Sequence, residues 1–325
     1  MRAGGNLKRM LKLDEISKIY KVGTFGGKKL QAVNNVSFDI GDGEVVSLIG
    51  ESGSGKSTIG KMILHLISIS SGSVIFNGVD VSTLKGRALK EYYRNVQGVF
   101  QDPFSSYNPI FKADRVFRNI KEEFFPEVMA AQWNEKVEKS LDAVGLNPDH
   151  VLNKFPHQLS GGQLQRFLIA RALLLDIQFL VADEIISMLD ASTRMDVLNL
   201  LADLKSRGLS ILFITHDLSL GYYISDKSVI LYSGSVVEKG STEKIYNNPF
   251  HPYTKMLMAS VPRLHKKWKE VEAELKAKES GRTIGCVYYD RCTSPEKEEC
   301  CANERPLLVE VEPDHFVACD RCRDN

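Results

Sequence analysis

Short apolar segments alternate with longer amphipathic ones along the first 260 residues of the chain. "AVNNVSFDI" alternates apolar and polar positions as a half-buried strand does, whereas "VVSLIG", "FLVAD" and "SILFIT" are apolar runs typical of buried parallel strands. Apolar residues at helical spacing follow these runs, as in "STIGKMILHLI". The alternation of strands and helices predicts an α/β core with a parallel sheet.

Two segments depart from this alternation. The pattern between about residues 102 and 155 predicts mostly helices, and a charged stretch, "RLHKKWKEVEAELKAKESGR", follows the core. Because Lys and Glu are mixed along that stretch, it predicts an exposed helix or linker rather than a membrane contact. We expect a core domain at 1–265, with a helical subdomain at about 102–165, and a C-terminal extension at 266–325.

The charge and hydropathy of the chain argue against a nucleic-acid-binding, membrane-spanning or secreted protein. Forty-two basic residues against forty-one acidic ones give a net charge of +1, which offers no electrostatic case for a nucleic-acid partner. The apolar runs are far shorter than the roughly 20 residues that cross a bilayer, and the N-terminal segment lacks the features of a secretory signal. We therefore expect a cytoplasmic chain whose thiols stay reduced.

A glycine-rich loop connects one predicted strand to a helix. "GESGSGKST" fits the pattern G-x-x-x-x-G-K-[ST], in which backbone N–H groups surround phosphate oxygens at a helix N-terminus. Lys56 would reach the β- and γ-phosphates, and Ser57 would offer its hydroxyl to Mg²⁺. The alternative is an ordinary glycine turn, but the strand before it and the helix after it favour a nucleotide site. The candidate phosphate-binding residues are Gly50, Ser52, Gly53, Ser54, Gly55, Lys56, Ser57 and Thr58.

Two adjacent carboxylates follow the apolar run "FLVA". Asp183 would hold the Mg²⁺ shell, and Glu184 would polarise the attacking water as a general base. An Asp-Glu pair alone is usually just solvated, and only its position after a buried strand makes it a candidate.

"QLSGGQLQR" contains a Ser-Gly-Gly turn that opens a helix, which is a second anion-binding terminus. One nucleotide does not need two such termini from a single chain. "LSGG" alone is a weak pattern, but it stands some 110 residues after the glycine-rich loop and about 20 before Asp183. In this order the three motifs resemble those of the ATP-binding cassette (ABC) ATPases.

The resemblance implies a fold and a set of roles. The fold is a P-loop NTPase, with a RecA-like parallel core sheet, an antiparallel β subdomain and a helical signature subdomain. The signature turn of one subunit would cover the γ-phosphate held by the other. The implied in-trans residues are Ser160, Gly161, Gly162, Gln163 and the D-loop Asp190.

Further roles carry over from the family position by position. Gln101 in "VFQDPF" matches the glutamine that contacts Mg²⁺ and water, so Ser57, Gln101 and Asp183 would form the Mg²⁺ set. His216 in "FITHD" matches the histidine that contacts the γ-phosphate, and Tyr20 matches an aromatic that stacks on adenine. The alternatives are a surface glutamine, a helix-capping histidine and an exposed strand tyrosine. The catalytic group would be Glu184, His216, Gln101 and Lys56.

The chain departs from the family pattern at one position. The resemblance leads us to expect proline after the catalytic glutamate, and Ile185 stands there instead. Proline would rigidify the turn into the D-loop, so its replacement affects the loop geometry and leaves the chemical groups in place.

The intervening segments are similar to those of the dipeptide and oligopeptide importer ATPases, of the second-ATPase type, across roughly residues 10 to 265. "VFQDPFSSYNP" and "NPFHPYTKMLMASVP" carry this likeness. It implies a peripheral subunit at the cytoplasmic face of the membrane that couples ATP and Mg²⁺ to peptide or related oligosaccharide uptake. The implied partners are a second ATPase, two permeases and an extracytoplasmic binding protein. A heterodimer is expected, with a homodimer as the alternative. The other function considered is a non-transport regulator or adaptor.

All six cysteines lie in the last forty residues. Only "CDRC" has zinc-type spacing, whereas an iron–sulfur cluster takes four thiolates from scattered positions. The tail is similar to that of importer ATPases in which such cysteines ligate a [4Fe-4S] cluster. This resemblance maps the ligands to Cys286, Cys292, Cys300 and Cys319, with Cys301 or Cys322 as alternates. Zinc and free thiols remain the other interpretations.

Overall fold

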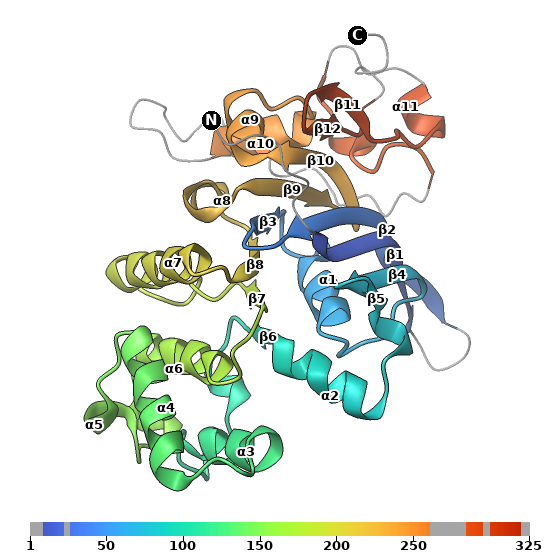
Figure 1. Cartoon of the computed structure of the whole chain (residues 1–325). Helices are drawn as coiled ribbons and strands as arrows, with labels where there is room; N and C mark the ends of the chain where they lie inside the picture. Colours follow the sequence, from blue (N-terminus) through green and yellow to red (C-terminus); the bar gives the residue numbers. More distant parts are fainter. Residues whose placement is uncertain (1–8, 23–26, 261–283, 295–299, 320–325) are drawn as a thin grey trace. The chain divides into compact units, whose positions relative to one another are not determined.

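The computed structural model describes residues 9–22, 27–260, 284–294 and 300–319 (Figure 1). The predicted charged stretch, residues 263–282, lies outside them. The chain divides into two compact units. Unit 1 contains the described residues of 1–41, 45–82 and 213–325, and unit 2 contains 42–44 and 83–212.

Unit 1 contains an antiparallel sheet of four strands in the order β2-β1-β4-β5. The strands are β1 (Arg9–Val22), β2 (Lys28–Gly41), β4 (Ser71–Phe76) and β5 (Val79–Asp80). The predicted strand "AVNNVSFDI" lies in β2, and its apolar positions Val33, Val36 and Ile40 are buried, as the alternation requires.

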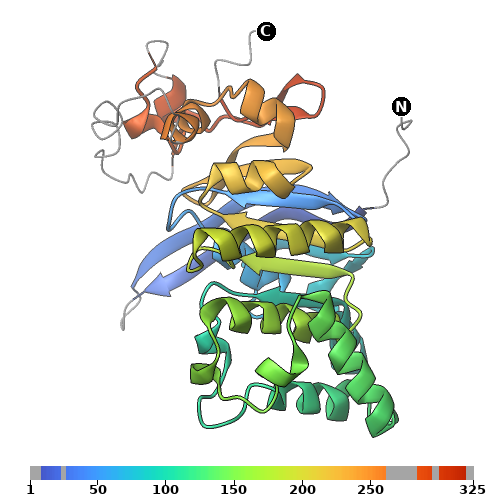
Figure 2. The same cartoon turned by 90° about the vertical axis from the view of Figure 1, so that its left-hand side faces the viewer.

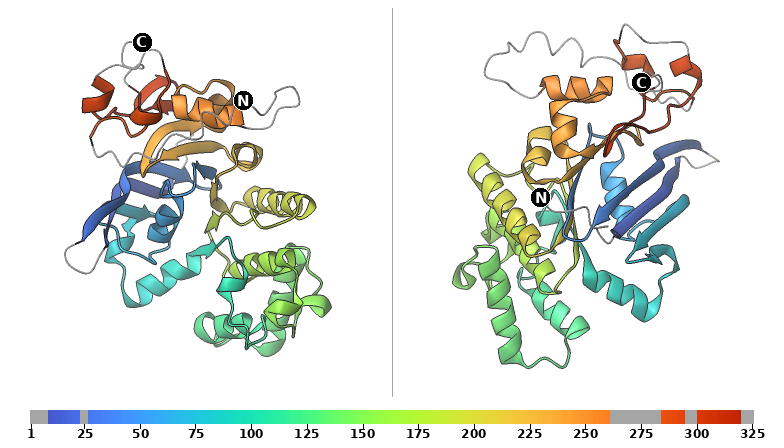
Figure 3. Two further views of the ribbon diagram at one scale, coloured as in Figure 1. Left: turned by 180° about the vertical axis from the view of Figure 1, so that it is seen from behind. Right: turned by 45° about the horizontal axis from the view of Figure 1, so that its top comes forward.

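A second group of strands in unit 1 runs in the order β11-β12-β10-β9-β3. These are β3 (Val45–Ile49), β9 (Lys227–Tyr232), β10 (Ser235–Ser241), β11 (Val309–Glu312) and β12 (His315–Val317). β3 and β9 are parallel, and the other neighbours are antiparallel. The hairpin β11–β12 from the C-terminal region therefore extends the sheet beyond β10 (Figure 3).

The helices of unit 1 lie around these strands. They are α1 (Lys56–Ile63), α8 (Leu218–Ile224), α9 (Thr242–Asn247), α10 (Pro252–Ser260) and α11 (Cys300–Asn303), with 3₁₀ turns at Val81–Thr83 and Tyr289–Arg291. α1 ends earlier than the apolar spacing of "STIGKMILHLI" predicts, because His65 adopts a left-handed φ of 53°.

A buried cluster joins α10 to the C-terminal region of unit 1. It contains Tyr232, Tyr253 and Tyr288, and Cys286 and Cys292 pack against it. The ring centroids of Tyr288 lie 5.1 Å from Tyr232 and 5.4 Å from Tyr253. The segment 284–294 therefore belongs to the core of this unit.

Unit 2 is mainly helical (Figure 2). It contains the parallel strands β6 (Val96–Val99) and β7 (Phe179–Asp183), and β8 (Ser210–Thr215) carries the chain back to unit 1. Its helices are α2 (Gly86–Asn95), α3 (Arg115–Phe124), α4 (Ala130–Ala143), α5 (Pro148–Val151), α6 (Gly161–Leu173) and α7 (Ala191–Ser206), with 3₁₀ turns at Phe104–Ser106 and Pro156–Gln158. Phe117 of α3 stacks on Phe167 of α6 at 4.5 Å, which anchors the helical segment to α6.

Within the described residues, we find no helix whose length and apolar character would allow it to span a bilayer.

Candidate nucleotide-binding site and cysteine region

The glycine-rich loop of unit 1 connects the buried strand β3 to α1. Gly55 caps α1 with a left-handed φ of 102°, which turns the backbone sharply before Lys56. Lys56 is 4% exposed, and its Nζ donates to the carbonyl oxygens of Gly50 at 2.7 Å and Glu51 at 2.8 Å. A buried ammonium group therefore lies across the start of the loop, held by two backbone carbonyls.

Two glycines of this loop are required sterically. A Cβ on Gly50 would lie 2.2 Å from the carbonyl oxygen of Leu231, and one on Gly55 would lie 2.4 Å from that of Ala32. The buried hydroxyl of Ser54 has no hydrogen-bond partner among the described residues. A buried hydroxyl without a partner costs free energy unless a ligand completes it, so the loop fits a phosphate-bearing group.

A cavity of about 280 Å³ lies against the outer side of the loop, within unit 1. Glu51 to Ser54, residues 30–32 of β2 and the turn at Tyr232 to Gly234 line it. Tyr20 of β1 lies opposite Leu30 of β2 in the antiparallel strand pair. Lys18 Nζ lies 5.2 Å from the centroid of the Tyr20 ring. The residues that line the cavity do not include Tyr20.

The two predicted carboxylates are at the end of β7 in unit 2. Asp183 is 6% exposed, and Glu184 follows with a left-handed φ of 51°. A left-handed conformation costs a non-glycine residue on the order of 1 kcal/mol, and such strain is concentrated at functional sites. The backbone carbonyl of Glu184 accepts hydrogen bonds from the N–H and the hydroxyl of Ser187 at 3.1 and 2.9 Å, which closes the turn.

Ile185 takes the position where proline was expected. It is 1% exposed, and Ile186 is 2% exposed. The turn is therefore fixed by apolar burial and by the Ser187 bonds instead of by a proline ring.

The Ser-Gly-Gly turn opens α6 with a capping box. Ser160 Oγ accepts from the N–H of Gln163 at 3.1 Å, and Gln163 Oε1 accepts from the N–H of Ser160 at 2.9 Å. Asp190 caps α7 and accepts from the N–H and hydroxyl of Thr193. A Cβ on Gly162 would lie 2.6 Å from Thr193 Cγ2, so the structure brings the starts of α6 and α7 together.

Hydrogen bonds to the Asp190 carboxylate lower its pKa from the ordinary value. The strongest comes from the hydroxyl of Ser192, and Thr193 supplies the others. Asp190 is therefore an ionised cap at neutral pH.

Gln101 and His216 are both exposed and follow strands in different units. Gln101 comes after β6 in unit 2, where Arg171 of α6 donates to the carbonyl of Gly98 at 2.9 Å. His216 comes after β8 in unit 1, and the next residue, Asp217, caps α8. The other predicted residues divide likewise: Tyr20 and the glycine-rich loop lie in unit 1, and Asp183, Glu184, Ser160–Gln163 and Asp190 lie in unit 2.

Four cysteine thiols of the C-terminal region are described. Cys286, Cys292, Cys301 and Cys319 are half-buried, and none of these four forms a disulfide. Burial, and then the proximity of the other three thiols, raises the pKa of Cys286 to about 11. Nothing is described of the Cys300 side chain, and Cys322 lies outside the described residues. Within the described part of the chain, no group of three or more His, Cys, Asp or Glu residues could hold a metal ion.

The cysteine region contacts the glycine-rich loop, which the sequence did not predict. Arg291 binds Glu51 through two hydrogen bonds of 2.7 and 3.1 Å. These residues are 240 positions apart, so no spacing pattern could signal the pair.

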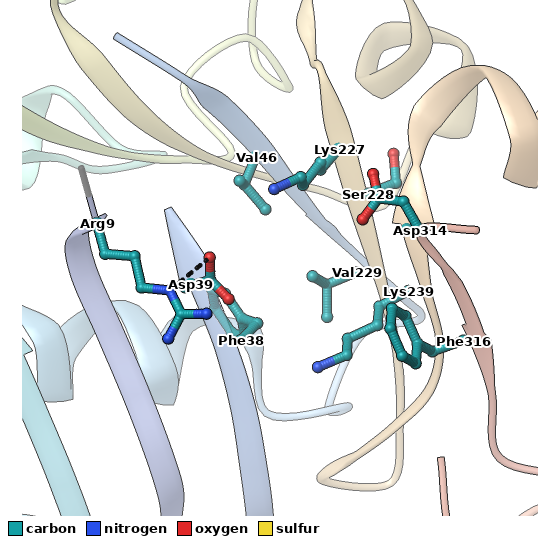
Figure 4. Close-up of a pocket in the computed structure, with 11 residues that line it drawn as sticks. Arg9, Phe38, Asp39, Val46, Lys227, Ser228, Val229, Lys239, Asp314 and Phe316 are labelled. Carbon is teal, nitrogen blue, oxygen red and sulfur yellow. Dashed lines mark ion pairs between the residues drawn. The ribbon is translucent and has the colours of Figure 1, made fainter. Parts of the chain in front are cut away.

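A second cavity, of about 320 Å³, lies between β2, the β9–β10 strands and the β11–β12 hairpin (Figure 4). Arg9, Lys227 and Lys239 line it together with Asp39 and Asp314. Three cations against two carboxylates give this cavity little net charge.

Comparison with known proteins places these features in context. A family model described as "ABC transporter" matches residues 33–187, and one described as "Oligopeptide/dipeptide transporter, C-terminal region" matches residues 237–301. The second match includes α10, the segment 284–294 and the beginning of α11.

Full-length relatives and solved structures agree. A putative peptide import ATP-binding protein of Brucella ovis is 42% identical, with 91% of this chain and 93% of that protein aligned. The oligopeptide transport ATP-binding protein AppF of Bacillus subtilis is 39% identical, over 97% and 98%. A dimeric ATP-binding cassette solved in a post-hydrolysis state with ADP and Pi aligns with a TM-score of 0.64 and 29% identity, over 72% of this chain and 99% of that one.

Proposed function

Since the chain belongs to the ABC transporter ATP-binding proteins, we propose that it is the ATP-hydrolysing subunit of an importer of dipeptides or oligopeptides. The observation that carries the proposal is the glycine-rich loop. Its buried Lys56 supplies a cation, and the hydroxyl of Ser54, which has no hydrogen-bond partner among the described residues, could bind a phosphate oxygen. The peptide substrate class rests on the C-terminal match and on the relatives' names. The nucleotide-binding domain would span 1–265, with its helical subdomain at 102–165 and the extension at 266–325.

The proposed site assigns a role to each group. Lys56 would bind the β- and γ-phosphates with the donor capacity that its contacts with the carbonyls of Gly50 and Glu51 leave, while residues of the loop cover the phosphates with backbone N–H groups. Ser57, Gln101 and Asp183 would hold Mg²⁺, which neutralises phosphate charge when bound. Tyr20 would stack on the adenine.

Glu184 would act as the general base for the attacking water, and His216 would orient that water and contact the γ-phosphate. The position of Glu184 directly after the buried strand β7, next to the buried Asp183, supports this role.

A second ATPase subunit would complete the site. The starts of α6 and α7 lie together, so Ser160, Gly161, Gly162, Gln163 and Asp190 could meet one nucleotide from the facing subunit. We propose a heterodimer at the cytoplasmic face of the membrane, under two permeases that receive substrate from an extracytoplasmic binding protein.

The test of the catalytic assignment is a pair of substitutions. Lys56→Ala should abolish ATP binding, whereas Glu184→Gln should keep ATP binding and lower kcat by roughly 10²- to 10⁴-fold. Glu243→Gln, at an exposed residue of α9, is the matched control and should keep the wild-type rate. Wild-type hydrolysis by Glu184→Gln would contradict the general-base role.

Uptake of a labelled peptide into proteoliposomes containing the assembled importer tests the transport assignment. Glu184→Gln should abolish uptake in that system. ATPase activity that responds to a soluble partner, without any permease, would favour the regulator instead.

For the cysteine region we propose a [4Fe-4S] cluster. The support is that Cys286, Cys292, Cys301 and Cys319 are half-buried thiols of one region and that none of them forms a disulfide. Because the described residues do not already form a group that could hold a metal ion, binding a cluster would require the thiols to rearrange. Cys286, Cys292, Cys300 and Cys319 would be the ligands, with Cys301 or Cys322 as alternates. A bound cluster would cross-link the segment 284–294 to α11 and to the end of β12.

Iron and sulfide analysis of anaerobically purified protein, with its visible absorbance, tests this cluster. Cys286→Ser should lose iron, and comparing the iron content of Cys300→Ser with that of Cys301→Ser identifies the third ligand. Zinc without iron, or a colourless metal-free protein, would contradict the proposal.

A further inference from the structure

The contact between the cysteine region and the phosphate-binding loop rests on Arg291. This residue ends the 3₁₀ turn Tyr289–Arg291, immediately before Cys292. Its NH1 donates to Glu51 Oε2 at 2.7 Å and its NH2 donates to Glu51 Oε1 at 3.1 Å. Such a two-point pair between a guanidinium and a carboxylate fixes geometry as well as charge.

The surroundings hold Arg291 in one orientation. Its side chain is 5% exposed, and its Cζ lies 5.7 Å from the ring centroid of Tyr232 and 5.8 Å from that of Tyr288. Tyr288 is itself 5% exposed and packs against Tyr253 in the buried cluster. The Arg291 guanidinium is therefore held by the surrounding core side chains, unlike a flexible arginine at the surface.

Glu51 is the second residue of the loop and is held on several sides. Its N–H donates to the hydroxyl of Tyr253 at 2.9 Å, and its carbonyl accepts from Lys56 Nζ at 2.8 Å and from the N–H of Ser54 at 3.2 Å. Its side chain carries the pair to Arg291. The conformation of Glu51 thus sets where the loop begins to turn.

The start of the loop is held from inside and from outside. Lys56 Nζ has three N–H donors, and its contacts with the carbonyls of Gly50 and Glu51 use two of them, so it can bind a phosphate oxygen without releasing either carbonyl. Arg291 and Tyr253 hold Glu51 from outside the loop. Pre-organisation of this kind lowers the cost of binding.

We propose that Arg291 is a positioning residue for ATP: acting through Glu51, it holds the start of the phosphate-binding loop in its binding conformation and links the segment 284–294 to ATP affinity. This inference rests on the proposed nucleotide site. It adds a role for the C-terminal region in that site, independent of whether the cysteines carry a metal.

The test compares ATP binding and hydrolysis in variants of the full-length subunit. Arg291→Gln should raise the Kd and KM for ATP about tenfold, the usual scale for losing a charge-assisted pair, and should change kcat by less than about threefold. Arg291→Lys should recover part of the affinity, because it keeps the charge but loses the fork.

Glu51→Gln removes the charge of the other partner of this pair, on the loop side. It should weaken ATP binding to a similar extent. If the two residues act together, Arg291→Gln with Glu51→Gln should be no worse than either alone. Should Arg291→Gln fail to fold, Glu51→Gln with its wild-type core decides the matter, and wild-type ATP affinity in that variant overturns the proposal.

The matched control is Arg305→Gln. Arg305 belongs to the same C-terminal region and donates to the hydroxyl of Ser235 rather than to Glu51. It should keep the wild-type KM for ATP. An equal rise in Arg305→Gln would assign the effect to general damage of the region and would refute the role of Arg291.

Lys56→Ala distinguishes an error in the proposed nucleotide site from an error in the role of Arg291. If Lys56→Ala binds ATP normally, the proposed nucleotide site is wrong. If Lys56→Ala abolishes binding while Arg291→Gln binds ATP as the wild type does, the site stands and the positioning role is wrong.

Discussion

His315 of β12 lies between two carboxylates in the core of unit 1. Its Nε2 is 2.7 Å from Glu238 Oε1, and its Nδ1 is 2.8 Å from Glu312 Oε1. Because a neutral imidazole has only one N–H, both contacts are satisfied only by the protonated ring. His315 and the Glu238 side chain are fully buried, so the pair joins the hairpin β11–β12 to β10 without solvent.

The perturbation is His315→Leu, which leaves the Glu238 carboxylate buried without its cation. Removing one partner of a buried pair costs about 3 to 5 kcal/mol, and the lower end applies here because Glu238 keeps two backbone donors, the N–H groups of Phe250 and His251. A loss of about 3 kcal/mol corresponds to a melting temperature lower by roughly 6 to 12 °C for a domain of 150–250 residues.

The pH dependence gives a second, independent readout. Burial alone would lower the pKa of His315, but the hydrogen bonds that its ring donates to Glu238 and Glu312 outweigh burial and raise the pKa. A raised pKa in the folded state contributes stability that is fully present below the unfolded value of about 6.5. This contribution is lost as pH rises through the folded pKa.

The assay is thermal melting of wild type, His315→Leu and His315→Gln between pH 5.5 and 9, with hydrogen exchange of β12 measured in parallel. The difference between wild type and His315→Gln should shrink as pH rises above 6.5. His150→Gln, at an exposed residue of α5, is the control and should follow wild type. A difference that grows with pH, or a wild-type melting temperature for His315→Leu, would show that a protonated His315 does not stabilise unit 1.

Two further predictions concern the starts of α6 and α7. Gly161→Ala should stabilise unit 2 by up to about 1 kcal/mol, because no described atom lies within 4 Å of the added Cβ and alanine is the better helix former. Gly162→Ala should destabilise it through the 2.6 Å approach to Thr193 Cγ2, and urea melts that show the reverse order would contradict the geometry. Asp190→Asn should weaken α7 at neutral pH, since the lowered pKa of Asp190 contributes stability that is present above its unfolded value of about 3.9 and is lost as pH falls through the folded pKa. Helicity of Asp190→Asn that falls in acid as much as that of wild type would count against the cap.

The sequence predicts most accurately what neighbouring residues determine. β3, the glycine-rich loop and α1 follow one another within about twenty residues, so apolar spacing and glycine positions suffice to predict them. The same holds for the capping box at Ser160 and Gln163, whose hydrogen bonds are three residues apart.

Contacts between distant segments could not be predicted in this way. The pairing of β12 with β10 joins residues more than seventy positions apart, and "HFV" is too short for periodicity to identify as a strand. The Arg291–Glu51 pair depends on Tyr232 and Tyr288 meeting in the folded core. The pattern of neighbouring residues contains no information on contacts between distant residues, because those contacts depend on how the strands assemble into the sheet.

Tyr288 has a practical consequence for how the C-terminal region can be studied. Its ring covers Tyr232 and Tyr253 in the buried cluster of unit 1. Truncation of the chain before residue 284 would expose the rings of Tyr232 and Tyr253 to solvent. An exposed apolar patch of this kind promotes aggregation. Loss of activity on deletion would then measure solubility, so single substitutions are the sound way to separate the contributions of this region.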